Sequence, residues 1–298
     1  MIGLIVRLTG VAIAIGAAVF LAFFLLQSEN APPAGRDGQA DPPGISDEAV
    51  THGGESQPDA AKSDEQTQTV NRAERLVQFE RERAQNDPHG VDAALRRNYP
   101  VEHAALISAM FDAAEAGAAE IELRRRHTAF VTELIKRKIH FAPYASPKAL
   151  RAYFEYNMRL IDVVRRKMGA QICAEVVAGG GSALVMRLRS TDIQDVDEIV
   201  ALLARQTRAI LAILRDGEAS GARALAQPIS ADWRHLYRAM EQLGAQNTEI
   251  GQFQNGSLVD PEKICAVTRI YYAALLALGP EASARMHPFV SKQMLVGK

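Results

Sequence analysis

The residues most able to do chemistry in this sequence are its two cysteines, Cys173 and Cys265. Each lies in a segment with a helical pattern of apolar residues, beside Ile172 and Ile264 respectively. A reactive thiol needs a neighbouring base or a second cysteine three residues away, and neither pattern is present. An even number of cysteines in an oxidising compartment is typical of a disulfide, with two buried thiols as the alternative. We therefore predict that Cys173 bonds to Cys265.

A run of three glycines and a serine, Gly179 to Ser182, follows the first cysteine. A phosphate-binding loop needs a strand before the glycines and a lysine just after them. Here a helical pattern precedes the run, and the next basic residue is Arg187. A nucleophile elbow would need a second glycine where Leu184 stands. The run therefore predicts the end of a helix and a flexible turn.

The seven histidines form no recognisable metal-binding or catalytic motif. No two of them are two or four residues apart, and the sequence contains neither H-E-x-x-H nor S-x-x-K. Most carboxylates are mixed with arginines along helical segments, which is typical of solvated helix faces. We predict no catalytic residue, no metal ligand and no cofactor, and we favour a protein without enzymatic activity.

One segment, from Leu123 to His140, is unusually basic, with Glu133 as its only acid. Its basic residues, apart from histidines, are Arg124, Arg125, Arg126, Lys136, Arg137 and Lys138. A patch of this kind would bind phospholipid headgroups, an anionic polymer or an acidic partner. Three consecutive residues on a helix, however, fan across about 200°, and the apolar residues between them indicate a helix packed on the core. A solvated helix face is the favoured interpretation, and a site for an anionic partner is the alternative.

The elements that must position these residues begin with an apolar segment. Residues 8–26 contain no charged residue and would extend roughly 28 Å as a helix, close to the hydrocarbon thickness of a bilayer. The run is too long for the apolar part of a cleaved signal peptide, and Pro32 and Pro33 follow it. We therefore favour an uncleaved transmembrane anchor. Arg7 predicts that residues 1–7 are cytoplasmic and that the rest of the chain is exported.

The composition of the chain indicates where the exported part would lie. Arginine is preferred to lysine and alanine is abundant, as in a bacterium with a GC-rich genome. We therefore predict a single-pass protein of the bacterial inner membrane with its main domain in the periplasm. Nucleic acid is not an expected partner, because this domain would lie outside the cytoplasm.

Residues 27–69 have the composition of a disordered linker. They are rich in Pro, Gly, Ser and acids and nearly devoid of aliphatic residues, so burial cannot offset the entropy of ordering them. Their nine acids and two bases give a net charge of −7. Because the whole chain carries −1 and the anchor one arginine, residues 70–298 carry +5. An acidic tether with an average reach on the order of 40 Å would thus precede a mildly basic domain.

Residues 70–298 show helical periodicity and no convincing strand. We predict an all-α domain of seven to nine helices, the first of them a charged helix near Val70 to Gln85. Residues typical of helix starts stand at five further places: Tyr99-Pro100, Ser146-Pro147, Thr191-Asp192, Ser230 and Asp260-Pro261. Helix ends are predicted at Asp216-Gly217 and Gly279-Pro280.

This architecture favours an interaction or scaffold component of a cell-envelope assembly, because an anchor and a spacer serve to position a domain. The expected partners are the inner membrane, through residues 8–26, and other envelope proteins. Two alternatives stay open. One is an enzyme acting on envelope material with active-site residues scattered in the sequence, and the other is a carrier of a lipid or another apolar ligand inside the helical bundle.

Overall fold

The computed structural model describes residues 60–190, 197–221 and 224–296. The predicted anchor, residues 8–26, and most of the predicted linker lie outside these residues. No helix of the described part is both long and apolar enough to cross a membrane. The first described helix, α2, begins at Ala60, so the last ten residues of the range predicted as linker belong to a helix.

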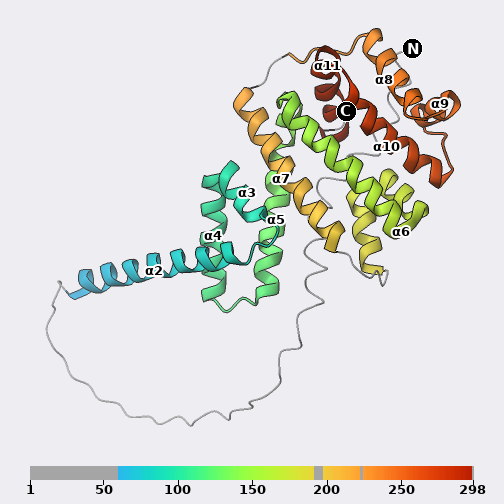
Figure 1. Cartoon of the computed structure of the whole chain (residues 1–298). Coiled ribbons are helices and arrows are strands. Elements are labelled where there is room, and N and C mark those ends of the chain that lie inside the picture. Colours follow the sequence, from blue (N-terminus) through green and yellow to red (C-terminus); the bar gives the residue numbers. More distant parts are fainter. Residues whose placement is uncertain (1–59, 191–196, 222–223, 297–298) are drawn as a thin grey trace.

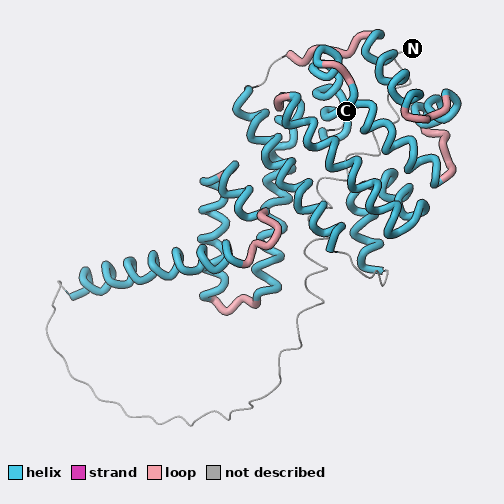
Figure 2. Tube along the Cα trace, in the orientation of Figure 1, coloured by secondary structure: helices cyan, strands magenta, loops and turns pink. Residues whose placement is uncertain are grey.

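The described part of the chain consists of helices and contains no strand, which confirms the all-α prediction (Figures 1 and 2). The elements are α2 (Ala60–Gln85), α3 (Val91–Asn98), α4 (Pro100–Glu115), α5 (Glu120–Lys138), the 3-10 helix η2 (Ile139–Tyr144), α6 (Pro147–Ser190), α7 (Asp197–Ser220), α8 (Ser230–Gln242), α9 (Asn247–Asn255), α10 (Pro261–Ala277), α11 (Pro280–Ser291) and the π-helix η3 (Lys292–Val296). The predicted number of seven to nine helices was wrong, since these ranges hold ten α-helices. Helices as short as α3 and α9 contain too few turns to show a clear period.

The predicted helix starts are largely confirmed. α4, α6, α8 and α10 begin at the predicted positions. Before α10, the Asp260 carboxylate accepts hydrogen bonds from the backbone N–H groups of Glu262 at 2.9 Å and Lys263 at 3.4 Å. α10 and α11 are separated at Gly279 as predicted, whereas α7 continues past Gly217 to Ser220. The predicted start at Thr191-Asp192 lies outside the described residues.

α6 is not a straight helix. It contains 44 residues, but the Cys173 Sγ lies 4.0 Å from the carbonyl oxygen of Ile161, twelve residues earlier. Twelve residues of straight helix would separate the two by roughly 18 Å. Between them stands Gly169 with φ of +82°, a left-handed conformation that glycine adopts without a steric penalty. The chain therefore turns back at Gly169, and the ribbon of α6 in Figure 1 is bent accordingly.

A second bend lies near the three glycines. The Arg187 Nε donates to the Glu175 carboxylate at 2.7 Å, although these residues are also twelve apart. The prediction that a helix ends at Gly179 to Ser182 was wrong, because α6 continues through them to Ser190. The ion pair nevertheless requires the chain to bend between its two partners. The chain therefore bends near these glycines, as the predicted turn required, but it does so within α6 and not at its end.

The two cysteines join α6 to α10. The sulfurs of Cys173 and Cys265 lie 2.11 Å apart, with a Cα–Cα distance of 6.1 Å. Both side chains are fully buried in the core between the two helices. The structure therefore has the predicted pairing at disulfide distance.

α7 packs against both halves of the molecule. One side contacts α6 and η2, and another contacts α3 and α5 (Figure 1). The predicted apolar stripe is buried, including Ile199, Leu203, Ile210 and Leu214. Near the end of α7, Gly217 lies directly against η2. The N-terminal helices α2–α5 and the C-terminal helices α6–α11 thus share one core through α7.

Replacing Gly217 with alanine should destabilise the fold. A Cβ at this position would lie 2.0 Å from the backbone oxygen of Phe141, which no side-chain movement can relieve. We expect a loss of about 1–3 kcal/mol in the free energy of unfolding, measured by urea denaturation. Gly251→Ala is the matched control, because a Cβ there meets nothing within 4 Å. An equal loss in both variants would contradict the close packing of α7 on η2.

Removing the Cys173–Cys265 link should also destabilise the fold. Because the two cysteines are 92 residues apart, the chain-entropy model gives a loss of about 4–5 kcal/mol in the free energy of unfolding. Cys173→Ala and the double alanine variant should unfold at similar urea concentrations, and a reducing agent should shift only the wild type. Free thiols in the denatured, non-reduced protein would show that the pair is not bonded.

Candidate functional site

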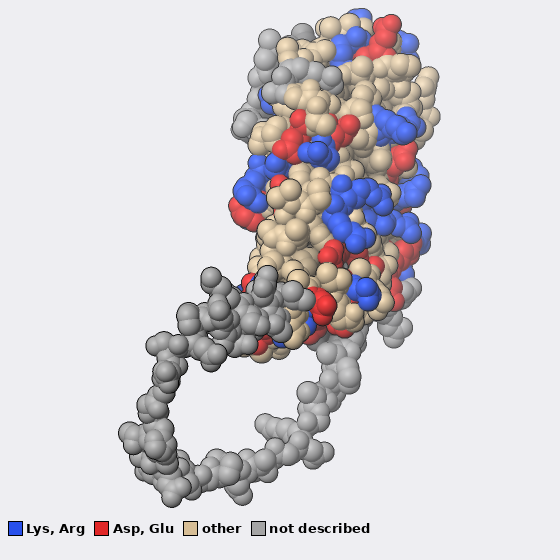
Figure 3. Space-filling model, turned by 90° about the vertical axis from the view of Figure 1, so that its left-hand side faces the viewer, with Lys and Arg blue, Asp and Glu red and all other residues tan. Residues whose placement is uncertain are grey.

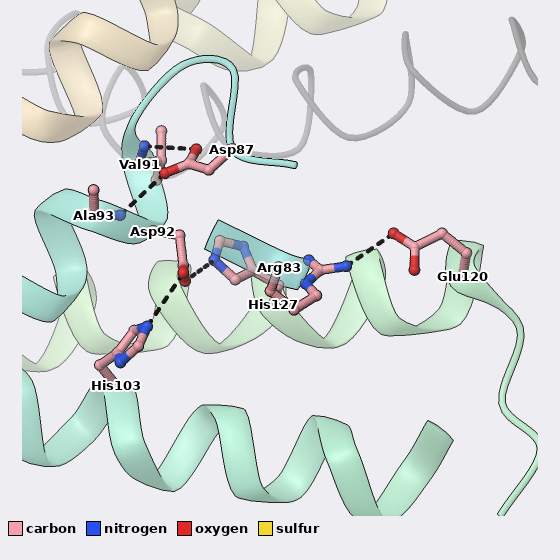
Figure 4. A network of polar contacts seen from close by, with 8 residues as sticks. All are labelled: Arg83, Asp87, Val91, Asp92, Ala93, His103, Glu120 and His127. Atoms are coloured by element: carbon pink, nitrogen blue, oxygen red, sulfur yellow. Dashed lines mark hydrogen bonds and ion pairs between the residues drawn. The ribbon is translucent and has the colours of Figure 1, made fainter. Parts of the chain in front are cut away.

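A carboxylate bridges two histidines where α3, α4 and α5 meet (Figure 4). Asp92 is in the first turn of α3, His103 is on α4 and His127 is on α5. One oxygen of Asp92 lies 3.2 Å from the Nε2 of His103, and the other lies 3.4 Å from the Nε2 of His127. A single carboxylate therefore contacts both neighbouring helices.

The network is shielded from solvent. The side chains of Asp92, His103 and His127 are 14%, 4% and 15% exposed. Burial acts to raise the pKa of Asp92, but the contacts with His103 and then His127 outweigh it and hold the pKa well below its usual range. The carboxylate is thus ionised at neutral pH and acts as an acceptor that orients the two imidazoles. Among the described residues, no group of three His, Cys, Asp or Glu side chains could hold a metal ion.

Further polar contacts around this network join the same helices (Figure 4). The Asp87 carboxylate accepts hydrogen bonds from the backbone N–H groups of Val91 and Ala93, both at 3.0 Å, and so stabilises the start of α3. The Arg83 guanidinium donates to Glu120 at 2.9 Å and ties α2 to α5. These contacts fix the four N-terminal helices to one another. We therefore interpret the whole network as one that holds α2, α3, α4 and α5 in position.

The six basic residues predicted from the sequence do not form one patch in which all charges are available. Four of them pair with a carboxylate: Arg124 with Glu120 at 2.9 Å, Arg126 with Glu122 at 3.1 Å, Lys136 with Glu133 at 4.0 Å, and Lys138 with Glu218. Arg125 and Arg137 are exposed on α5. The pairing agrees with the favoured interpretation of a solvated helix face.

A different set of basic side chains follows the exposed side of α7. Arg205, Arg208 and Arg215 are three and seven residues apart, which places them within about 80° of one another around the helix. Ala212 lies between them on the same stripe and is exposed. The opposite side of α7 is the buried apolar stripe. Arg205 and Arg215 are exposed, whereas Arg208 is half-buried beside the turn at Gly90.

α3 packs beside α7 and carries an exposed arginine of its own. At the start of α3, a Cβ on Gly90 would lie 3.0 Å from the Nη1 of Arg208. At its end, the Lys138 ammonium lies 5.7 Å from the Tyr99 ring and pairs with Glu218 at the end of α7. The two helices therefore run side by side in the same direction, and Arg97 is exposed near the end of α3.

We call Arg97, Arg205, Arg208 and Arg215 the α3–α7 arginine surface. In the part of the chain that the structure describes, no carboxylate lies within 4 Å of the guanidinium groups of Arg97, Arg205 and Arg208. Arg215 contacts Glu218 at 3.7 Å, but Glu218 also pairs with Lys138. Figure 3 shows Lys and Arg side chains gathered on the side of the molecule where α3 and α7 lie in Figure 1. The surface therefore offers cationic groups that the fold itself does not neutralise.

Sequence spacing could not indicate either site. The members of the Asp92 network come from three helices and have no fixed spacing. The arginines of α7 do have helical spacing, in the segment RQTRAILAILRD, but their role depends on which face is exposed and on the position of α3.

Comparison with known proteins adds no relative from which a function could be transferred. No family model, no curated protein and no solved structure matches the chain.

Asp92→Asn should lower the free energy of unfolding by about 1–3 kcal/mol at pH 6, because the ionised acceptor between the two histidines is lost. The folded-state pKa of Asp92 is depressed, so its stabilising contribution is complete above the unfolded-state pKa of about 4 and declines below it. The gap between wild type and variant should therefore narrow in urea titrations from pH 6 to pH 3.

The control for this titration is Asp112→Asn. Asp112 pairs with Arg72 at 2.5 Å, but its side chain is 56% exposed, so the loss should be at most about 1 kcal/mol. A gap between wild type and Asp92→Asn that stays constant over this pH range would contradict the depressed pKa.

Proposed function

We propose that this protein is a membrane-anchored interaction module whose α3–α7 arginine surface binds an acidic segment of a partner protein. The observation that supports the proposal is that Arg97, Arg205 and Arg208 have no carboxylate within 4 Å among the described residues, while Arg215 shares Glu218 with Lys138. Inside the same fold, charged side chains such as Arg83, Arg166 and Arg285 are matched with carboxylates at 2.8–2.9 Å. Other arginines, such as Arg125 and Arg137, also lack a carboxylate among the described residues, but Arg205, Arg208 and Arg215 follow one side of a single helix.

The chemistry and size of the surface favour a peptide with carboxylates. A guanidinium matches a carboxylate in a planar, two-pronged hydrogen-bonded pair. Arg205 and Arg215 are ten residues apart on one helix, or roughly 15 Å, which equals the length of four or five extended residues. A lipid surface would be favoured by large apolar side chains between the arginines, whereas alanines stand at 209 and 212.

The proposed anchor and linker give this surface a cellular role. Residues 8–26 would hold the protein in the inner membrane, and the linker would let the domain search a periplasmic volume for its partner. The protein would then serve as a scaffold in an envelope assembly, as the order of anchor, linker and domain suggests.

The test compares two double variants of the full-length protein in detergent micelles. Binding of a fluorescent poly-glutamate peptide is measured by fluorescence anisotropy at low and moderate salt. Arg205→Gln with Arg208→Gln should weaken binding about tenfold, because two exposed charge pairs are lost. Arg124→Gln with Arg126→Gln is the matched control, since these arginines already pair with Glu120 and Glu122.

Circular dichroism and thermal unfolding check that both double variants fold. Equal affinity of wild type and the Arg205/Arg208 variant would overturn the proposal. Binding to vesicles that contain phosphatidylglycerol is measured in parallel. If the Arg205/Arg208 variant loses binding to these vesicles but still binds poly-glutamate, the proposal is also overturned, because the ligand would then be a lipid surface.

A further inference from the structure

We infer that residues 27–59 of this chain occupy the α3–α7 arginine surface and that an acidic partner must displace them. This inference rests on the proposed function and names a regulator of the same site. It makes the acidic segment a competitor of the partner, in addition to its role as a spacer.

The first argument is charge complementarity. Apart from His52, residues 27–59 contain one basic residue, Arg36, and seven carboxylates: Glu29, Asp37, Asp41, Asp47, Glu48, Glu55 and Asp59. The arginine surface carries four guanidiniums, of which only Arg215 has a carboxylate within 4 Å among the described residues. Opposite charges held in one molecule attract one another over the Debye length of about 8–10 Å.

The second argument is the length of chain available. Residues 27–59 continue directly into α2, whose 26 residues extend roughly 39 Å. The far end of α2 leads through the turn at Gly90 to the arginine surface. The acidic segment would extend to roughly 110 Å if stretched and has an average reach on the order of 30 Å as a flexible chain. It is therefore long enough to fold back along α2.

The third argument concerns the basic residues nearest to the segment. Arg72 and Arg75 of α2 pair with Asp112 and Glu115 of α4, both at 2.5 Å, and both lie over the Phe111 ring. Arg83 pairs with Glu120. These cations are already neutralised. Arg81 of α2 is exposed and donates to the Gln78 side chain at 3.3 Å, but it is a single cation, whereas the arginine surface beyond the end of α2 offers several guanidiniums to free carboxylates.

The consequence would be a threshold for partner binding. A tethered segment acts at an effective concentration on the order of 1 mM. If its intrinsic dissociation constant is about 100 µM, it occupies the surface about nine-tenths of the time and weakens the apparent affinity for a partner about tenfold.

The first experiment uses full-length protein in which the seven acids of residues 27–59 are replaced by Asn or Gln. Poly-glutamate should bind about tenfold more tightly to this variant than to the wild type. In the background of Arg205→Gln and Arg208→Gln, the same replacement should change the affinity little. The arginine substitutions are therefore also compared in the acid-neutralised protein, where no segment competes. If they do not weaken poly-glutamate binding there, the proposed function fails. If they do weaken it but neutralising the acids leaves the affinity of the protein with intact arginines unchanged, only the present inference fails.

The second experiment detects the contact itself. Arg205→Lys and Arg208→Lys keep the charges and introduce amines that a carbodiimide couples to nearby carboxylates. Mass spectrometry of the monomeric product should find peptides joining these positions to acids of residues 27–59, and 0.5 M salt should suppress them. The absence of such peptides, or their occurrence only in dimers, would overturn the inference.

Discussion

The rest of the structure depends on the burial of α7 between α6 on one side and α3 and α5 on the other. A helix packed on several sides can leave only a narrow stripe in water. On α7 that stripe carries Arg205, Arg208 and Arg215, while Ile210 and Leu214 fill the core. The same helix thus supplies both an apolar contact that joins the two halves of the fold and a row of charges on its solvent-facing side. A change that shifts α7 would alter stability and surface chemistry together.

Buried carboxylates have charged or polar partners within the fold, whereas several arginines of this surface have none among the described residues. Asp92 is held by two histidines, and Asp232 accepts two hydrogen bonds of 2.8 Å from Arg285. The second pair lowers the pKa of Asp232 and fixes the start of α8 to α11. A buried carboxylate is costly unless its donors are supplied, and both sites supply them from neighbouring helices. The unmatched arginines are tolerated because water solvates them.

Local features of the fold could be predicted from the sequence, and features that depend on distant contacts could not. The starts of α6 and α10 follow from Ser146-Pro147 and Asp260-Pro261, because capping involves adjacent residues. The cysteine pairing followed from there being only two thiols. The turn at Gly169 was missed because a single glycine within an apolar helical pattern has no distinct spacing. The Asp92 network and the position of α3 beside α7 arise only from tertiary packing. The predicted anchor and most of the linker lie outside the described residues.

The order of elements along the chain has a consequence for biosynthesis. α3 and α5 bury part of their apolar surface against α7, which is completed about 120 residues after α3, or roughly 6–24 s later at ordinary translation rates. During that interval α3 lacks a packing partner that contacts it in the finished fold, where residues such as Leu95 are fully buried. A newly made chain therefore exposes apolar surface of these helices until α7 has been synthesised.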